Sequence, residues 1–258
     1  MIALTFNPIT DEFLIQELPI PTLCSDDVLI KVAACGLNPV DAKIFMWKTM
    51  IPSMDNHWTP GLDVSGEIVA VGTGVVEWKI GDRVLYHGNM MRPHGGLAEY
   101  AVHKATTLIR HPAVSANDAA ATPCAGWTAF RALHDKLRIE KTHSLLVTGG
   151  SGGVGSFAIQ IAKDAGLHQI LTTCSAKNHP LVLSLGATVA IDYHTEDVLS
   201  KIREITSEQG VNRALDTVGG NEDFLVAESL AFEGEMLELV DVVRPQEYRD
   251  PFLVGLKP

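Results

Sequence analysis

The stretch VTGGSGGVGSFAIQIAK, residues 147–163, places five glycines within seven positions, between an apolar run and an apolar helix-like segment. The run SLLVTG (144–149) predicts a strand, and the apolar residues after the glycines recur with the spacing of a helix. Gly150, Gly152 and Gly155 satisfy the pattern G-x-G-x-x-G. A strand, a glycine turn and a helix in this order predict the first unit of an α/β domain.

Strands and helices are predicted to alternate from this stretch to residue 240. Continuous apolar strands that alternate with helices are typical of a parallel sheet covered on both faces. We therefore expect residues 119–258 to form a Rossmann domain with a doubly wound parallel sheet. The later predicted strands are 169–175, 188–193, 213–219 and 234–240. The first predicted helix begins at residue 153, and the others are 178–185, 196–208 and 222–231.

Residues 1–118 have a different rhythm, with short β-prone segments separated by Pro, Gly and Asp. This pattern is typical of a small, irregular β-barrel. One helix is predicted within it at 39–47, because Pro39 suits a first helical turn. After residue 115, two helical stretches broken near Pro123 lead into the second half. The β-prone segments are IALTF, FLIQEL, DVLIKVAAC, SGEIVAVG and DRVLYH.

The glycine turn predicts a binding site for the phosphates of a dinucleotide. One glycine permits the tight turn, a second lets a pyrophosphate approach the backbone, and a third lets the helix pack on the strand. The helix amino terminus adds unpaired N–H groups and a partial positive charge. Ordinary loop glycines are the alternative that this context disfavours. The predicted phosphate-binding residues are Gly150, Ser151, Gly152, Gly153, Val154 and Gly155.

Two competing motifs overlap or precede this turn. Ser151 lies in a G-x-S-x-G pattern, but a nucleophile elbow needs a later histidine and none follows His194. Tyr100 and Lys104 match the Tyr-x-x-x-Lys of short-chain dehydrogenases, but they lie on a predicted strand. Residues four apart on a strand do not stack as they do on a helix. The dinucleotide interpretation is therefore favoured over both.

The end of the second predicted strand indicates which dinucleotide binds. NAD enzymes usually place an acid there to bind the ribose 2′-hydroxyl. No acid occurs between Asp164 and Asp192, and Ser175 and Lys177 occupy the place where a carboxylate would repel a 2′-phosphate. A hydroxyl donor and an ammonium group attract phosphate. We therefore predict NADPH rather than NADH as the cofactor.

Composition excludes several classes of partner. The 258 residues carry a net charge of −11, so nucleic acid is not an expected partner. No basic segment followed by an apolar one opens the chain, and no apolar stretch approaches the ~18 residues that span a bilayer. These features predict a cytoplasmic protein with a small-molecule substrate and no membrane contact. The cysteines, which form no C-x-x-C pair, are Cys24, Cys35, Cys124 and Cys174.

Six stretches follow one another along most of the chain: GLNPVDAK (36–43), PGLDVSGEIVAVGTGV (60–75), IGDRV (80–84), GGLAEYAV (95–102), GWTAFRAL (126–133) and GGSGGVG (149–155). In this order they resemble the medium-chain dehydrogenase/reductase superfamily and its zinc-independent quinone oxidoreductase branch. The resemblance implies a GroES-like β-barrel domain before the Rossmann domain. It also implies NADPH-dependent hydride transfer to a quinone or an α,β-unsaturated carbonyl, and a homodimer for a full-length chain. An alcohol or acyl dehydrogenase and an NADP(H)-binding protein without turnover are the alternatives.

The positions of the family's zinc ligands predict that no metal is bound. Where zinc-dependent members have a cysteine, this chain has Asn38. Where they have the histidine of Gly-His-Glu, it has Leu62 before Asp63, and the cysteines of the structural zinc lobe are absent from the sequence. Asn and Leu cannot supply the thiolate and imidazole that zinc prefers. Asp63 is open to either a structural or a catalytic role.

The resemblance also implies roles for single residues. Asn38 would lie near the nicotinamide and the substrate oxygen, and Asp41 would help fix that segment. Thr128 would face the nicotinamide side. Tyr193 would pack beside the adenosine 2′-phosphate, and Val218 is assigned to the cofactor site as well.

The family usually continues for several tens of residues beyond the position of Pro258. A sixth strand and a segment that completes the first domain are expected there, and the absence of that strand exposes the hydrogen-bonding groups of the fifth. We therefore expect a C-terminally truncated product in which the cofactor architecture is intact.

Overall fold

The computed structural model describes residues 1–220 and 222–240, and the chain forms two compact units, Met1–Cys124 and Ala125–Pro258. The predicted boundary after residue 118 falls inside helix α3 (Ala116–Ala120), which belongs to the first unit. Each unit has its own sheet and its own buried core. No helix in the described part of the chain is both long and apolar enough to cross a membrane.

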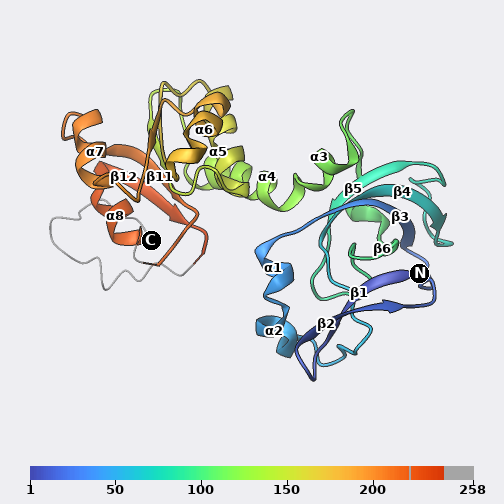
Figure 1. Cartoon of the computed structure of the whole chain (residues 1–258). Coiled ribbons are helices and arrows are strands. Elements are labelled where there is room, and N and C mark those ends of the chain that lie inside the picture. The colour runs from blue at the N-terminus through green and yellow to red at the C-terminus, as the bar shows by residue number, and fades with distance from the viewer. Residues whose placement is uncertain (221, 241–258) are drawn as a thin grey trace. The chain divides into compact units, whose positions relative to one another are not determined.

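The first unit is built on an antiparallel sheet with the strand order β6-β3-β4-β5-β7, beside a hairpin of β1 and β2 (Figure 1). Its core is made of β-branched and aromatic side chains such as Ile30, Ile68 and Tyr86, types that fit a pleated, half-buried surface. The strands are β1 (Ile2–Asn7), β2 (Glu12–Glu17), β3 (Asp27–Gly36), β4 (Asp63–Val71), β5 (Arg83–His87), β6 (Tyr100–Lys104) and β7 (Ile109–Arg110).

The helix predicted at residues 39–47 is two short helices, α1 (Pro39–Ala42) and α2 (Ile44–Trp47). They are separated at Lys43, where the backbone (φ −87°, ψ 15°) leaves the helical region. The Trp47 indole N–H donates to the Val40 carbonyl at 3.0 Å, which fixes the second helix against the first. Three-residue 3₁₀ turns follow at Lys48–Met50 and Ala105–Thr107.

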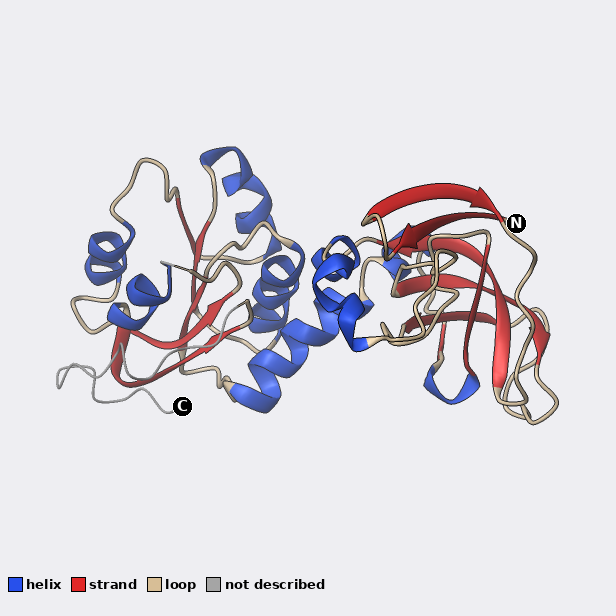
Figure 2. Ribbon diagram, turned by 90° about the horizontal axis from the view of Figure 1, so that it is seen from below, coloured by secondary structure: helices blue, strands red, loops and turns tan. Residues whose placement is uncertain are grey.

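The second unit is a parallel sheet with the strand order β10-β9-β8-β11-β12, covered by helices on both faces (Figure 2). Leu145 and Val147 of β8 point into one apolar core, and Leu146 points into the other, as strand alternation requires. The strands are β8 (Ser144–Val147), β9 (Gln169–Thr173), β10 (Val189–Ile191), β11 (Val211–Asp216) and β12 (Leu230–Glu238). The helices are α4 (Pro123–Phe130), which begins in the first unit, a π-helix (Arg131–Lys136), α5 (Gly153–Asp164), a 3₁₀ turn (Ala176–Asn178), α6 (His179–Leu185), α7 (Val198–Ile205) and α8 (Glu222–Glu228).

The predicted doubly wound parallel sheet is confirmed, with one difference at its edge. The helix predicted to reach residue 231 ends at Glu228, and β12 begins at Leu230 instead of 234. The strand starts early because Leu230 pairs with Val211, ahead of a shift in register. Within the described residues β12 pairs on one side only, with β11.

Candidate functional site

The glycine turn of the second unit connects β8 to α5, and steric contacts explain two of its glycines. A Cβ atom on Gly150 would lie 1.9 Å from Oγ1 of Thr172, and one on Gly155 would lie 2.4 Å from the Gly149 carbonyl oxygen. Gly149 itself has φ +62°, a conformation that L side chains rarely adopt. The backbone path of this turn therefore requires glycine at these positions.

The turn fits the phosphates of a dinucleotide. Gly152 is the N-cap of the 12-residue helix α5, and no side chain caps the first-turn N–H groups there. A Cβ atom on Gly152 would meet only the Gly149 carbonyl oxygen, at 3.2 Å, so little else crowds this position. Uncapped N–H groups at a helix amino terminus bind anions. Gly153 and Val154 open the same helix.

Ser151 lies in the turn with its hydroxyl engaged by a residue that the sequence interpretation missed. Its Oγ accepts a hydrogen bond from Asn178 Nδ2 at 3.0 Å. Asn178 ends the 3₁₀ turn after β9, far from the glycines in sequence. The contact joins the glycine turn to the segment that carries Ser175 and Lys177.

Three polar side chains meet at the carboxyl ends of β9 and β10. Ser175 Oγ lies 3.4 Å from the Tyr193 hydroxyl and 3.3 Å from His194 Nε2. The rings of Tyr193 and His194 contact each other at a tilt of 40°, with centroids 4.2 Å apart. Lys177 is exposed two residues after Ser175. Ser175, Lys177 and Tyr193 were predicted from the sequence as cofactor residues, and His194 was not. We call Ser175, Lys177, Tyr193 and His194 the β9 polar group.

Asp192, which directly precedes Tyr193 in the chain, uses its carboxylate for hydrogen bonds within its own turn. Asp192 accepts hydrogen bonds from the His194 backbone N–H (3.2 Å) and the Thr195 hydroxyl (3.1 Å). These bonds, the His194 one first, hold the pKa of the carboxyl below its usual value. Asp192 therefore shapes the turn at the end of β10.

Val218 lies beside the glycine turn, after β11. A Cβ atom on Gly149 would lie 3.1 Å from Val218 Cγ2. The position is fixed by Asp216, which is fully buried and accepts the Val218 backbone N–H at 2.9 Å. The predicted cofactor residues of the second unit thus surround the carboxyl ends of β8, β9 and β11.

In the first unit, antiparallel pairing gathers a polar cluster around the buried carboxylate of Asp63. Asp63 begins β4, opposite Gly36 on β3 and His87 on β5. One oxygen, Oδ1, lies 2.6 Å from His87 Nδ1, and Oδ2 accepts the Asn38 amide (2.9 Å) and the Cys124 backbone N–H (2.9 Å). We call Asn38, Asp63, His87 and Cys124 the Asp63 cluster. Only Asn38 and Asp63 were singled out from the sequence.

Asp41 holds the other end of Asn38. Its Oδ2 accepts the Asn38 backbone N–H at 2.8 Å, so both the backbone and the side chain of Asn38 are fixed by carboxylates. Asp41 is 5% exposed. Burial raises the pKa of its carboxyl above the ordinary value, and backbone hydrogen bonds oppose that shift.

Two groups in the described residues have the composition of a metal site. Asp63, His87 and Cys124 each offer a ligand atom within 4.8 Å of the others, and so do Asp216, Asp223 and Glu238. In the first group both carboxylate oxygens already accept hydrogen bonds, and burial raises the pKa of the Cys124 thiol to about 11. Metals bind the thiolate, and without a metal ion this thiol is protonated at pH 7. Absence of zinc stays a prediction.

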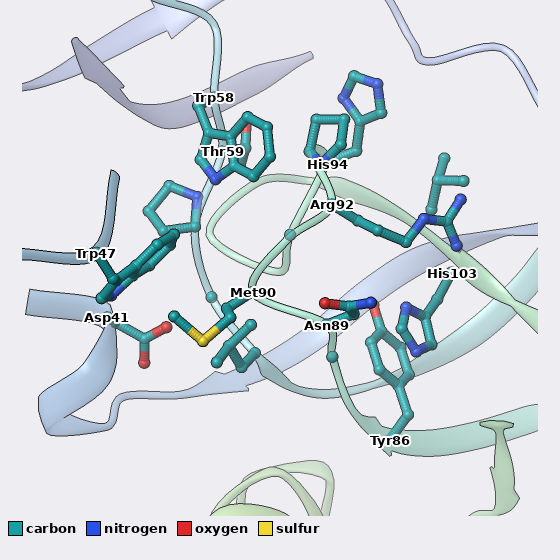
Figure 3. A pocket seen from close by; sticks show the side chains of 17 residues that line it. Asp41, Trp47, Trp58, Thr59, Tyr86, Asn89, Met90, Arg92, His94 and His103 are labelled. Atoms are coloured by element: carbon teal, nitrogen blue, oxygen red, sulfur yellow. The ribbon is translucent and has the colours of Figure 1, made fainter. Parts of the chain in front are cut away.

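A small pocket lies next to Asp41, between Trp47 of α2, the segment with Trp58 and the loop of residues 88–95 (Figure 3). Arg92 holds the second loop, because its Nη2 donates to both oxygens of the buried Asp27, at 3.0 and 2.9 Å. The space is about 20 Å³. That is room for one water molecule, so the pocket does not accept a quinone ring in this conformation.

The ring stack of Tyr86 and His103 closes one side of that pocket (Figure 3). The rings are parallel, with centroids 4.3 Å apart. Burial lowers the pKa of His103 to about 4. His103 is therefore neutral at pH 7.

Thr128 is half-buried on α4, one helical turn after Cys124. It belongs to the second unit, whereas Asn38 and Asp41 belong to the first. Its role toward the nicotinamide stays a prediction.

Comparison with family models matches both units. Residues 25–113 match the alcohol dehydrogenase GroES-like domain, and residues 153–239 match the zinc-binding dehydrogenase domain. A chloroplast envelope quinone oxidoreductase homolog of Arabidopsis thaliana is 42% identical over 190 residues, which are 70% of this chain and 56% of that protein. The chain spans between 56% and 61% of the first three curated relatives that it matches.

Solved structures agree with these matches. The quinone oxidoreductase from Coxiella burnetii is 29% identical, with a TM-score of 0.84 over 99% of this chain and 81% of that one. The Escherichia coli quinone oxidoreductase complexed with NADPH is 25% identical, with a TM-score of 0.84 over 99% and 79%. The predicted α/β fold, a GroES-like domain followed by a Rossmann domain, is confirmed. The chain belongs to the medium-chain dehydrogenase/reductase superfamily and resembles its quinone oxidoreductases.

Proposed function

We propose that this protein transfers a hydride from NADPH to a quinone or an α,β-unsaturated carbonyl without zinc. The observation that carries the proposal is the uncapped glycine turn beside the β9 polar group, where Ser175, Tyr193 and His194 converge and the nearby Asp192 is engaged in its own turn. The names of the relatives and the NADPH complex of the E. coli structure support it.

The residues of the second unit would hold the cofactor. The N–H groups of Gly153 and Val154 would bind the pyrophosphate at the amino terminus of α5. Lys177 and the hydroxyl of Ser175 would bind the 2′-phosphate, and His194 lies within hydrogen-bond distance of that hydroxyl. When bound, NADPH supplies the hydride.

The residues of the first unit would orient the acceptor and stabilise its oxygen. Nδ2 of Asn38 carries two protons, and one of them is donated in the hydrogen bond to Asp63 Oδ2. The second proton is the donor for the negative charge that develops on the acceptor oxygen, and Asp63 and Asp41 keep Asn38 from reorienting. Quinones and enones are electrophilic already, so orientation and one such donor suffice.

A panel of 1,4-quinones, 2-alkenals and 2-alkenones, assayed with NADPH and with NADH, tests this function. We expect oxidation of NADPH that depends on the acceptor, and a lower dissociation constant for NADPH than for NADH. Tighter binding of NADH would contradict the cofactor assignment. Activity restored by zinc after chelation, with a simple alcohol as substrate, would indicate an alcohol dehydrogenase instead.

A second candidate is an NADP(H)-binding protein without turnover. The pocket beside Asp41 has room for one water molecule and none for a quinone ring, which favours this candidate. Binding of NADPH without oxidation by any member of the panel would select this candidate.

Assembly and location remain proposals. We propose a homodimer for the full-length protein, which sedimentation would test. A cytoplasmic location is a proposal too, because curated relatives include proteins named as chloroplastic.

A further inference from the structure

We propose that His87 donates the proton that the acceptor oxygen needs, and that Asp63 is the positioning residue that orients it. The proposal rests on the proposed function. It assigns the second half of the reduction, the proton, to a residue that neither the glycine turn nor the family's zinc positions identify.

The geometry is that of an acid–imidazole dyad built on a sheet. Asp63 and His87 face each other on the neighbouring strands β4 and β5, and Asp63 Oδ1 lies 2.6 Å from His87 Nδ1. Directly opposed side chains on antiparallel strands are held close by the register itself. Because Nδ1 is occupied, His87 exchanges protons through Nε2.

Burial differs between the two partners in the sense that proton transfer requires. The side chain of Asp63 is 2% exposed and that of His87 is 33% exposed. The carboxylate therefore stays inside the unit as a hydrogen-bond acceptor. The imidazole remains accessible to water and to a quinone or enone. Imidazole is the side chain that changes charge near neutral pH, which suits a proton donor at that pH.

One carboxylate orients both proposed donors. Asp63 Oδ1 faces His87, and Oδ2 accepts the Asn38 amide and the Cys124 backbone N–H. Both oxygens of Asp63 are therefore engaged by partners within the first unit. The amide that stabilises the oxyanion and the imidazole that protonates it thus share one anchor.

Other groups of the first unit suit the role less well. Burial raises the pKa of the Cys35 thiol to about 12 and that of the Cys124 thiol to about 11, so both are weak acids. His103 is 5% exposed and neutral at pH 7, since burial lowers its pKa to about 4. A proton donor works best with an affinity matched to the operating pH.

The acceptor gains a hydride from NADPH at a ring carbon or at the β-carbon, and the displaced electron pair moves to its oxygen. The imidazolium of His87 gives its Nε2 proton to that oxygen, which forms an O–H bond and leaves a neutral imidazole. Asp63 keeps its bond to Nδ1 throughout, and a proton from water restores the imidazolium.

The test compares wild type with His87→Gln, Asp63→Asn and His57→Gln, a control at an exposed histidine of the same unit. For an enone acceptor, we expect kcat of His87→Gln to fall by at least about tenfold with an unchanged NADPH dissociation constant. The control keeps the kcat of wild type. In proton NMR spectra of nitrogen-15-labelled wild type, we expect a downfield signal from the proton on His87 Nδ1. That signal should be lost in Asp63→Asn.

The outcomes separate the two proposals. Wild type that oxidises NADPH, with an equally active His87→Gln, overturns the proton-donor role alone. Stoichiometric zinc whose removal abolishes activity also overturns it, because His87 would then be a metal ligand. If wild type fails to oxidise NADPH with every acceptor of the panel, the proposed function is overturned, and the proton-donor role of His87 is overturned with it. Thermal unfolding of each variant identifies a loss of kcat that comes from misfolding.

Discussion

The glycine turn and the Asp63 cluster are the two candidate sites of this protein, and they are built in opposite ways. The turn is a continuous segment whose function depends on backbone shape, since a Cβ atom on Gly150 would collide with Thr172 at 1.9 Å. The cluster is assembled from four separate segments, and its function depends on side-chain partners of one buried carboxylate, Asp63. We therefore expect the glycine turn to be disrupted by added side-chain atoms, and the Asp63 cluster to be disrupted by the removal of a hydrogen-bond partner.

The largest effect is expected at Gly150. In Gly150→Ala the new methyl group would displace the turn, because Thr172 is fully buried and cannot move aside. We expect NADPH affinity to fall at least about 100-fold, and the free energy of unfolding to fall by about 2 to 3 kcal/mol. Fluorescence titration and urea unfolding measure the two. Binding of NADPH by Gly150→Ala with wild-type affinity would show that backbone shape does not define this site.

The next effect tests how the first unit depends on partners. Arg92→Met leaves the buried Asp27 carboxylate without its ion pair, and removal of one partner of a buried pair costs about 3 kcal/mol. Lys104→Met is the matched control, because Lys104 pairs with the adjacent Asp26 on the surface. We expect urea unfolding to show the loss for Arg92→Met and no measurable change for Lys104→Met. Equal stability of both variants would contradict this account of the loop.

His103 makes the free energy of unfolding of the first unit depend on pH. Its pKa is lowered to about 4 by burial, so the unfolded chain binds the proton more tightly than the folded one. The stability that neutral His103 contributes is complete above about pH 6.5 and is lost as the pH falls toward 4, by up to about 3 kcal/mol. Unfolding curves at pH 7, 6 and 5 should show a smaller loss for His103→Phe, which keeps the stack on Tyr86. An equal loss of unfolding free energy with falling pH in wild type and His103→Phe would contradict the lowered pKa of His103.

The smallest effect concerns the choice of cofactor in the second unit. Lys177→Glu places a negative charge in the β9 polar group, so it should repel the 2′-phosphate of NADPH and leave NADH unaffected. We expect the ratio of the two dissociation constants to shift by about tenfold toward NADH, and less at high salt. Lys141→Glu, an exposed lysine before β8, is the control. An unchanged ratio in Lys177→Glu would remove Lys177 from the site.

The same contrast explains how much the sequence could predict. The turn was predicted because its glycines have a fixed spacing between a strand and a helix, and the parallel sheet followed from the alternating pattern. His87 and Cys124 were missed as partners of Asp63 because only strand register and a backbone N–H bring them together. His194 was missed for the same reason, since its contact with Ser175 joins the ends of two strands.

Local patterns also failed where tertiary contacts determine an element. The helix predicted at 39–47 breaks at Lys43, and the Trp47 indole bonds back to the Val40 carbonyl. Strand β12 starts at Leu230 because that residue pairs with Val211. Neither contact has a signal in the spacing of apolar residues.

The proposed function requires that the glycine turn holds NADPH for reduction of an acceptor. The most direct test is the rate of NADPH oxidation by a 1,4-quinone, measured against NADPH concentration for wild type and Gly152→Ala. The added methyl group meets only the Gly149 carbonyl oxygen, so the variant should fold, and the methyl would obstruct the pyrophosphate. We expect saturable oxidation by wild type and a half-saturating NADPH concentration raised at least about tenfold in Gly152→Ala. No oxidation above the uncatalysed rate, or identical curves for the two proteins, would contradict it.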